Sequence, residues 1–293
     1  VKDGKVFGRG ACDNKGGISI ALTAAKAIKE AEVELKGDIV LAFTADEEVG
    51  SHTGAAFLME RGAVSGDACL CTDGPADSIV SSFNGYIPFI VTTTGKTAHG
   101  AFPSHGINAI SKMVKVQSIF ARVEKSLRKE KSRYPSPPDT HEEYTSIVPT
   151  TINGGTRFYI VPDRCSSWID VHVVPDQDPK DIRRMIEEEI RKEQEKDPDL
   201  QVDIRVPLMA KPAIVDPSTT IVSKMQSAAK QVLGKELPMY RFTGLTDARF
   251  FIAAGIPTLT YGPHRVGSGF HAADERVKIE DLTTISKVYA LTA

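Results

Sequence analysis

The spacing of apolar and polar positions in the first part of the chain predicts alternating helices and strands. Residues 14–30, NKGGISIALTAAKAIKE, show the pattern of a buried helix whose first turn contains two glycines. The run GDIVLAF that follows predicts a buried strand at 38–44. A helix at 53–61 and a short strand at 68–72 come next. This order is typical of an α/β domain with a largely buried sheet.

After the residues NGY at 84–86 the pattern changes, and six further elements follow. They are strand 86–94, helix 106–129, strand 145–153, strand 164–174, helix 179–195 and strand 200–206. The order β-α-β-β-α-β is the ferredoxin-like split pattern, which forms a compact unit by itself. Between its first helix and its second strand, the segment RYPSPPDTHEEY at 133–144 is too rich in proline and charge for regular structure.

The α/β pattern resumes near residue 207 and continues to the end of the chain. Its elements are helix 217–233, strand 238–242, helix 246–254, strand 257–261 and a final helix from about 279. We therefore predict one α/β domain, formed by residues 1–83 and 207–293. A smaller ferredoxin-like domain at 84–206 interrupts it.

Length, charge and cysteine content narrow the classes of function. The 293 residues suffice for one large or two ordinary domains. With 36 basic and 38 acidic residues the net charge is −2, which argues against nucleic acid or an acidic membrane as partners. No apolar run reaches the roughly 18 residues of a membrane span. The cysteines follow neither a zinc-ribbon nor a disulfide-scaffold pattern, so we expect reduced thiols in a cytoplasmic protein: Cys12, Cys69, Cys71 and Cys165.

Three adjacent carboxylates follow the predicted strand 38–44, in the stretch TADEEVGS. Asp46, Glu47 and Glu48 repel one another and lose hydration wherever the strand end is covered. Either a positively charged group lies beside them, or the stretch is a solvated loop.

Three more candidate positions lie at strand ends or in the loops just after them. Asp13 lies in the glycine-flanked loop GRGACDNKGG, Asp73 in CTDGP and His271 in GSGFHAADERV. Sites in open α/β sheets form at the carboxyl ends of strands. Carboxylates and imidazole are ligands that zinc, manganese and cobalt accept. Each acidic residue taken alone has a second interpretation, as a turn residue or a helix cap.

Taken together, these segments resemble the di-zinc metallopeptidase family of aminoacylases, acetylornithine deacetylase, succinyl-diaminopimelate desuccinylase and glutamate carboxypeptidase. The resemblance covers essentially the whole chain and rests on the order of seven segments: GRGACDNKGG, DEEVGS, TDGP, TAHGAFPSHGINAI, INGGTRFYIVPD, GLTDARFFIAAGIP and HAADERV. The family fold is an α/β catalytic domain with an inserted ferredoxin-like lid. This fold agrees with the interruption at 84–206.

The resemblance implies two divalent metal ions, zinc in the first instance with cobalt or manganese as alternatives. Asp13 would bridge the two ions, Asp73 would bind one of them, and Glu48 with His271 would bind the other. Glu47, next to a ligand but not itself one, would be the general base that takes a proton from a metal-activated water. The cations would also make the cluster of carboxylates tolerable.

One ligand of the family has no counterpart in the sequence. It is a His in an H-x-D motif upstream of the position that matches Asp13, and none of the seven histidines precedes Asp13. We expect the natural chain to be longer at its N-terminus and to supply this ligand there. The alternative is a homologue that has lost one metal site.

The resemblance also implies substrate contacts, most of them from 84–206. His99 in KTAHGAF would reach the active site of the partner subunit and stabilise the tetrahedral oxyanion. Tyr159 stands where the family has Asn. His172 stands where the family has an Arg that grips a substrate carboxylate, so the preference for a free α-carboxylate stays open. Further candidates are Asn108, Arg157 and Thr246. Asn108 has an alternative role in the turn before the following helix, and Arg157 has one as an exposed surface residue. Thr246 lies in GLTDARF, which resembles a family loop near the substrate.

The leading hypothesis is a metal-dependent hydrolase that cleaves the amide bond of an N-acyl amino acid or a short peptide. We expect a cytoplasmic homodimer that associates through residues 84–206. The alternative hypothesis is a non-catalytic binding or regulatory homologue that has lost the first metal site.

Overall fold

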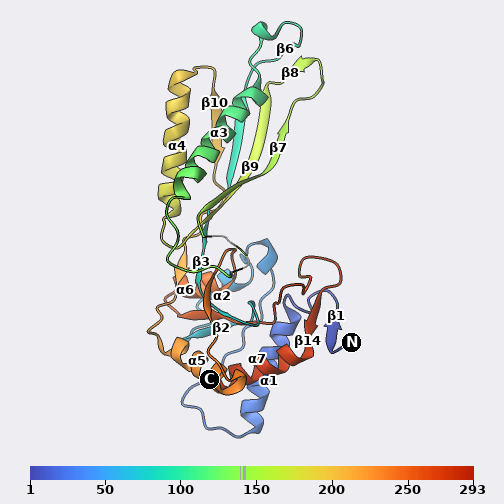
Figure 1. Ribbon diagram of the computed structural model, residues 1–293, viewed down its shortest axis with the longest axis vertical. Coiled ribbons are helices and arrows are strands. Elements are labelled where there is room, and N and C mark those ends of the chain that lie inside the picture. Colours follow the sequence, from blue (N-terminus) through green and yellow to red (C-terminus); the bar gives the residue numbers. More distant parts are fainter. Residues whose placement is uncertain (139, 141–142) are drawn as a thin grey trace. The chain divides into compact units, whose positions relative to one another are not determined.

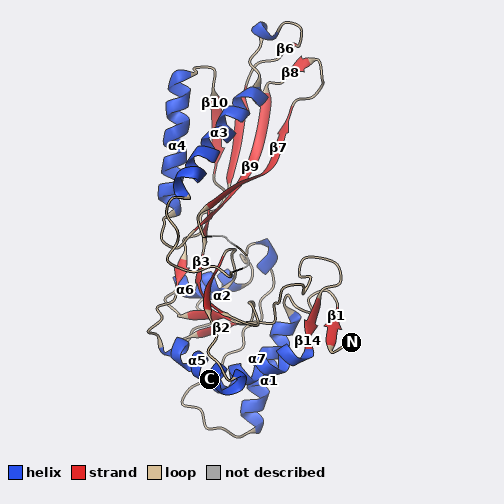
Figure 2. Ribbon diagram, viewed as in Figure 1, coloured by secondary structure: helices blue, strands red, loops and turns tan. Residues whose placement is uncertain are grey.

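The computed structural model describes residues 1–138, 140 and 143–293, and the chain forms two compact units (Figure 1). The first unit comprises residues 1–82, 213–242 and 246–293, and the second comprises 83–212 and 243–245. The sequence predicts irregular structure for the segment 133–144. Part of this segment lies outside the described residues. Helices and strands occur in both units (Figure 2), so the predicted α/β class is confirmed.

The first unit contains a mixed five-stranded sheet. Its order is β11 (Ala213–Ile214), β3 (Ile79–Phe83), β13 (Thr258–Thr260) and β2 (Cys69–Cys71), and β12 (Met239–Phe242) also pairs with β3. β13 runs parallel to β2 and antiparallel to β3. The carboxyl ends of β2 and β13 therefore lie at the same edge of the sheet. A separate antiparallel pair joins β1 (Lys5–Phe7) to β14 (Arg276–Lys278).

Helices surround this sheet and close the core of the first unit. They are α1 (Lys15–Glu30), α2 (Ala55–Glu60), α5 (Thr220–Leu233), α6 (Ala248–Ala253) and α7 (Ile279–Thr292), with the short 3₁₀ turn η1 (Glu47–Val49). α7 packs against both α1 and α5. The apolar faces of these three helices meet the sheet in one buried cluster that includes Ile20, Met225, Leu259, Tyr261 and Val288.

The start of α1 lies close to the end of β2. The side chain of Asn14 caps the helix by accepting a hydrogen bond from the backbone N–H of Gly17 at 3.1 Å. A Cβ atom on Gly17 would lie 2.0 Å from Asn14 Oδ1 and 2.5 Å from Thr72 Oγ1, so this approach requires glycine. The loop before α1 and the loop after β2 are thereby brought together.

The second unit has an antiparallel sheet whose strand order matches the predicted split pattern. The order is β10 (Gln201–Arg205), β5 (Phe89–Thr94), β9 (Arg164–Val173) and β7 (Ser146–Gly154), with β4 (Gly85–Tyr86) also paired to β9. The predicted strand 86–94 is divided into β4 and β5 at Pro88, because proline has no N–H to donate to a neighbouring strand. β6 (Ala98–His99) and β8 (Ile160–Val161) form a separate small pair.

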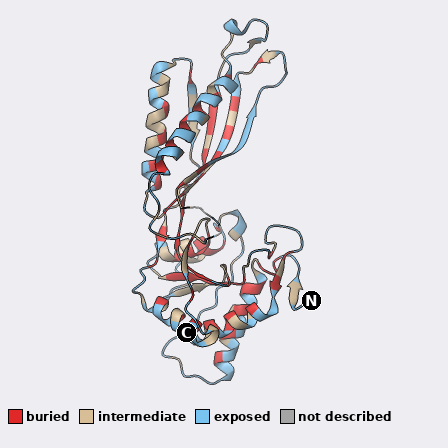
Figure 3. Ribbon diagram, in the orientation of Figure 1, coloured by how far each residue is buried: buried red, intermediate tan, exposed pale blue. Residues whose placement is uncertain are grey.

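Two long helices complete the core of the second unit, α3 (Ala109–Leu127) and α4 (Pro179–Lys196). Residues of both helices share one buried cluster with alternate residues of β5 and β9 (Figure 3). The 3₁₀ turn η2 (Pro103–His105) follows β6. Within the described ranges, no helix combines the length and the apolar character needed to cross a membrane.

The predicted strand at 38–44 is wrong. These residues have no regular secondary structure, and no described strand pairs with them. Val40 is 60% exposed and Phe43 is 50% exposed. The apolar and polar residues of this segment alternate as in a strand. Without a neighbouring strand, however, its backbone N–H and C=O groups have no hydrogen-bond partners that would hold a strand conformation. Sequence patterns also did not predict the short strands β1, β3, β11 and β14.

Candidate metal centre

The loop that carries Asp13 is held by the buried carboxylate of Glu275. The Oε1 atom of Glu275 accepts hydrogen bonds from the backbone N–H groups of Cys12 and Asp13, each at 2.9 Å. Its Oε2 atom accepts from the N–H of Gly10 at 2.9 Å and from the guanidinium of Arg9 at 3.1 Å. Burial alone would raise the pKa of Glu275, but the backbone donors lower it overall. An ionised Glu275 therefore fixes the position of Asp13.

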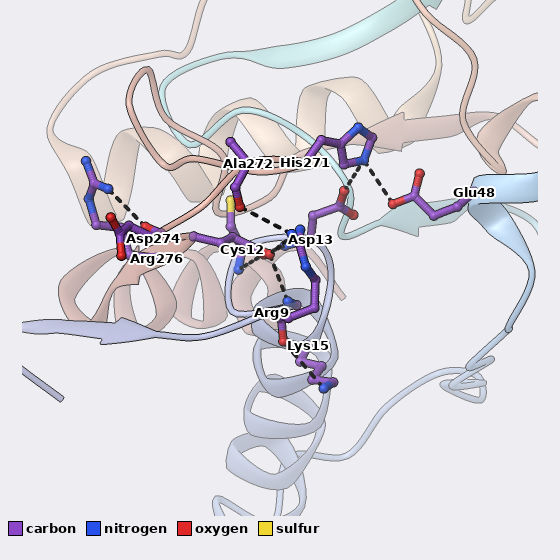
Figure 4. Close-up of polar contacts among 11 residues, drawn as sticks. Arg9, Cys12, Asp13, Lys15, Glu48, His271, Ala272, Asp274 and Arg276 are labelled. Atoms are coloured by element: carbon purple, nitrogen blue, oxygen red, sulfur yellow. Dashed lines mark hydrogen bonds and ion pairs between the residues drawn. The ribbon is translucent and has the colours of Figure 1, made fainter.

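His271 joins Asp13 to Glu48. Its Nε2 atom lies 3.0 Å from Asp13 Oδ2 and 2.9 Å from Glu48 Oε1 (Figure 4). Glu48 belongs to η1, whereas His271 lies in the loop between β13 and β14. Desolvation lowers the pKa of His271, but the two carboxylates outweigh it and raise the pKa overall. The potential ligand atoms of these three residues all lie within 4.8 Å of one another.

Asp13 also belongs to a second group, with Asp73 and His264. The potential ligand atoms of this group likewise lie within 4.8 Å of one another. Nε2 of His264 is 3.3 Å from Oδ1 of Asp73, but it lacks the geometry of a hydrogen bond. Burial, followed by the charge of Asp13, raises the pKa of Asp73 to about 7. Burial lowers the pKa of His264, which leaves its ring neutral at pH 7.

The chemistry of these two groups fits divalent cations that share Asp13. Carboxylate oxygens and imidazole nitrogens are common zinc ligands. Burial raises the pKa of Asp73 most, and repulsion by the neighbouring carboxylates adds to it; positive charge at this place would relieve that repulsion. The buried Nε2 of His264 has no hydrogen-bond partner among the described residues, and such an atom is costly unless it meets a ligand.

Glu47 has different surroundings from its neighbour Glu48. Neither group of potential ligands in the described part of the chain includes Glu47. Burial raises the pKa of Glu47 to about 7, and the charges of Asp247 and Glu48 add to this effect. The guanidinium of Arg249, which donates to the carbonyl oxygen of Gly50 at 3.1 Å, opposes it. A carboxyl group with a pKa near 7 is suited to accept and release a proton at neutral pH.

Asp46, the first of the three adjacent carboxylates, stabilises a turn. Its Oδ2 atom accepts hydrogen bonds from the backbone N–H and the hydroxyl of Thr53, at 2.5 and 2.8 Å. These bonds lower the pKa of Asp46. The three neighbours therefore differ in their surroundings: Asp46 fixes the loop, Glu47 is a half-buried titratable group and Glu48 belongs to a ligand group.

Three of the predicted substrate residues lie together in the second unit, around β6 and β8. Arg157 donates a hydrogen bond to the hydroxyl of Tyr159 at 3.0 Å. The ring of Tyr159 is tilted against that of His99, with 6.4 Å between the centroids. All three side chains are exposed, so this cluster is open to a ligand.

The other predicted substrate residues have contacts within the fold. Asn108 caps α3 by accepting from the N–H of Ser111 at 3.1 Å. Thr246 is 2% exposed, and its hydroxyl accepts from the N–H of Ala248 at 3.2 Å. These bonds favour structural roles for Asn108 and Thr246. His172 lies on β9 with its ring 5.0 Å from that of Tyr86.

His264 and Glu275 have no role predicted from the sequence, although both lie in the candidate site. A signal for His264 existed, because it closely follows the predicted strand 257–261 at the edge where Asp73 follows its own strand. Glu275 lies within the segment HAADERV, but no local pattern there predicts a buried carboxylate.

Comparison with known proteins gives one consistent family. Residues 1–293 match the family described as "Peptidase family M20/M25/M40". The chain is 28% identical to N-formyl-4-amino-5-aminomethyl-2-methylpyrimidine deformylase of Bacillus subtilis, over 98% of this chain and 71% of the relative. It is 27% identical to succinyl-diaminopimelate desuccinylase of Marinobacter nauticus, over 99% and 74%. The crystal structure of an aminopeptidase from Bacillus cereus has the same fold, with a TM-score of 0.79 at 20% identity, over 100% of this chain and 74% of that one.

Proposed function

The chain belongs to peptidase family M20/M25/M40, and from this membership we propose that it is a metal-dependent hydrolase of N-acyl amino acids or short peptides. Its relatives are named as a deformylase and a desuccinylase, which are activities on acyl groups. The observation that carries the proposal is the presence of Asp13 in both groups of potential metal ligands. A shared carboxylate is what a two-metal hydrolytic centre needs.

The ligand groups fit two divalent ions, with zinc as the first candidate and cobalt or manganese as alternatives. Asp13 would be shared, Asp73 would hold one ion, and Glu48 with His271 would hold the other. When bound, the ions would lower the pKa of a water molecule and polarise the carbonyl group of the substrate.

Glu47 would act as the general base. It would take a proton from the water molecule as the water oxygen attacks the amide carbonyl carbon. It would then give this proton to the nitrogen of the leaving amine as the carbon–nitrogen bond breaks. Its pKa of about 7 suits both transfers, and the neighbouring Arg249 would limit further upward shift.

Side chains of the second unit would contact the substrate. We propose that His99 reaches the active site of the partner subunit and donates a hydrogen bond there to the oxyanion formed when water adds to the carbonyl group. Arg157 and Tyr159, which contact each other beside His99, would bind polar groups of the substrate. His172 would bind a carboxylate more weakly than an Arg, because imidazole is only partly charged at pH 7.

We also propose that the protein is a cytoplasmic homodimer that associates through residues 84–206. Among the described strands β7 pairs only with β9, so its other edge is open to a second chain. β7 exposes Val148 and Ile152, which an interface would cover. All four cysteines are free thiols, as expected in a reducing compartment. Sedimentation of the wild type and a Val148→Asp, Ile152→Asp variant would test the dimer, and a monomeric wild type would contradict it.

A substrate panel tests the proposed activity. The protein would be stripped of metal with a chelator and reconstituted separately with zinc, cobalt and manganese. Release of primary amine would be followed on N-formyl, N-acetyl and N-succinyl amino acids and on dipeptides. We expect metal-dependent turnover of one of these classes. A protein that binds only one equivalent of metal and hydrolyses none of them would instead favour the non-catalytic alternative.

A further inference from the structure

A small pocket in the first unit has a lining rich in positive charge. It is formed by β1, β14, the loop after β13 and the start of α7, and its volume is about 130 Å³. The lining includes four cationic side chains, one carboxylate and one hydroxyl: Lys5, Arg265, Arg276, Lys278, Asp281 and Ser268. In the described part of the chain, none of these residues belongs to a group of potential metal ligands.

The pairing of β1 with β14 gathers three of these cations on one face. Lys5 lies directly opposite Lys278, and Arg276 lies opposite Phe7. Residues two positions apart on a strand face the same side, so the three cations share that side. Val277, between Arg276 and Lys278, is 2% exposed and belongs to the core. Because like charges directly opposite each other destabilise an antiparallel pair, a bound anion would stabilise this face.

The positive charge of the lining is only partly balanced. Arg265 is paired with Asp281, to which its Nε and Nη2 atoms donate at 2.7 and 2.8 Å. The other three cations form no ion pair within the described ranges. One of them, Arg276, donates instead to the carbonyl oxygen of Asp274 at 3.0 Å. Glu280, the other acidic residue in the first turn of α7, is exposed and does not line the pocket. Four cations against one carboxylate leave an excess of three positive charges.

We propose that this pocket binds a phosphate group, either free or as the end of a phosphomonoester. Its volume is below the roughly 300–1,000 Å³ of pockets for larger ligands, so it admits a compact anion. A dianion balances the excess charge better than a single carboxylate does. Guanidinium and ammonium groups are common partners of phosphate oxygens, and the N-terminus of α7 at Ile279 adds partial positive charge. Val266 in the lining is 91% exposed, so the pocket is open to solvent on the side where the rest of an ester would lie.

Calorimetric titration of the zinc-loaded protein with inorganic phosphate, after removal of unbound zinc, tests the site. The variant Lys5→Gln, Lys278→Gln keeps long polar side chains but removes two of the unpaired charges. The matched control, Lys235→Gln with Lys287→Gln, removes two exposed lysine charges elsewhere in the first unit. Ionic strength would be held at about 0.1 M with chloride, because salt screens exposed charges. A parallel titration with phenyl phosphate distinguishes a monoester from the free anion. Thermal unfolding would establish that each variant folds.

The wild type and the control should bind an equivalent of phosphate that the Lys5→Gln, Lys278→Gln variant binds at least about 10-fold more weakly, because two charge-assisted contacts are lost. Phosphate should also raise the melting temperature of the first two proteins more than that of the variant. Tighter binding of phenyl phosphate would identify a monoester as the ligand, and tighter binding of inorganic phosphate would identify the free anion.

Equal phosphate binding by all three folded proteins, as expected if phosphate binds only at zinc, would overturn the proposal. A wild type that binds no phosphate would overturn it as well. Neither result would affect the proposed hydrolase activity, because the pocket and the candidate metal centre share no ligand residue in the described part of the chain.

Discussion

The Oε1 atom of Glu275 accepts a hydrogen bond from the backbone N–H of Asp13 at 2.9 Å, although 262 positions separate the two residues. The side chain of Glu275 is 2% exposed, and the same oxygen also accepts from the N–H of Cys12. A buried carboxylate thus holds the loop that presents the shared ligand of the candidate metal centre. The position of Asp13 depends on a residue that would not itself touch a metal ion.

Replacing Glu275 with Gln should weaken zinc binding by about 10- to 100-fold, the usual effect of losing a group that orients a ligand. The amide N–H₂ of Gln would face either the backbone donors of the loop or Arg9, so buried donors would lose their acceptor. The free energy of unfolding should fall by about 1–3 kcal/mol. Calorimetric zinc titration and chemical unfolding measure the two effects. The control is Glu280→Gln, at an exposed position of α7. Unchanged zinc affinity in a folded Glu275→Gln variant would contradict the positioning role.

The metal-free protein should lose stability as pH rises from about 4 to about 7. Burial raises the pKa of Asp73 from 3.8 to about 7 and that of Glu47 from 4.5 to about 7. Each carboxyl group binds its proton more tightly in the folded than in the unfolded chain. Its contribution to stability is therefore complete below its ordinary pKa and is lost as pH rises through 7.

Melting temperatures measured in chelator across this pH range test that loss. Asp73→Asn should flatten the pH dependence, whereas Asp67→Asn, at an exposed position before β2, should leave it unchanged. Added zinc should restore stability near pH 7, because it binds the ionised carboxylates. Equal pH dependence in the two variants would show that Asp73 does not carry the effect.

Replacing His99 with Ala should lower kcat by about 100- to 1,000-fold, the usual effect of removing one oxyanion donor. Metal content should not change, since His99 belongs to neither ligand group in the described part of the chain. His105→Ala provides the control from the same exposed region of the second unit. Steady-state kinetics on the best substrate of the panel, with zinc analysis of each variant, measure both quantities. A His99→Ala variant with normal kcat would remove His99 from the mechanism.

The elements of the second unit were predictable because each buries one face at a regular period. β9 alternates the buried Ile169, Val171 and Val173 with more exposed residues. α3 buries Met113, Val116 and Phe120 at helical spacing. Such periods are visible in the sequence without knowledge of the neighbouring elements.

The segment 38–44 shows where a local pattern is insufficient. Its apolar residues have the spacing of a buried strand, yet Val40 and Phe43 are exposed and no described strand pairs with them. A strand is held by hydrogen bonds to its neighbours, and these depend on the rest of the fold. The short strands β1 and β14 were missed for the converse reason, since their pairing joins the two ends of the chain.

The candidate site was predictable only in part. Asp13 and Asp73 were candidates because acidic residues in loops at strand ends are typical of α/β sites, and their assignment as ligands came from the family resemblance. His264 satisfies the same rule, but its significance rests on the backbone contacts that hold it beside Gly74. The role of Glu275 depends on burial and on contacts across the chain, which are tertiary properties without a local sequence signal.

Glu47 and Glu48 provide the most direct test of the proposed mechanism, because two adjacent carboxylates are assigned different roles. Glu47→Gln and Glu48→Gln variants would be compared with the wild type for bound zinc and for kcat on the same substrate. Glu47→Gln should keep two equivalents of zinc and lose about 100- to 10,000-fold in kcat, because it removes proton transfer. Glu48→Gln should lose zinc, since its carboxylate lies 2.9 Å from His271 in a ligand group. Equal zinc loss in both variants, or normal turnover in Glu47→Gln, would contradict the division of roles between them.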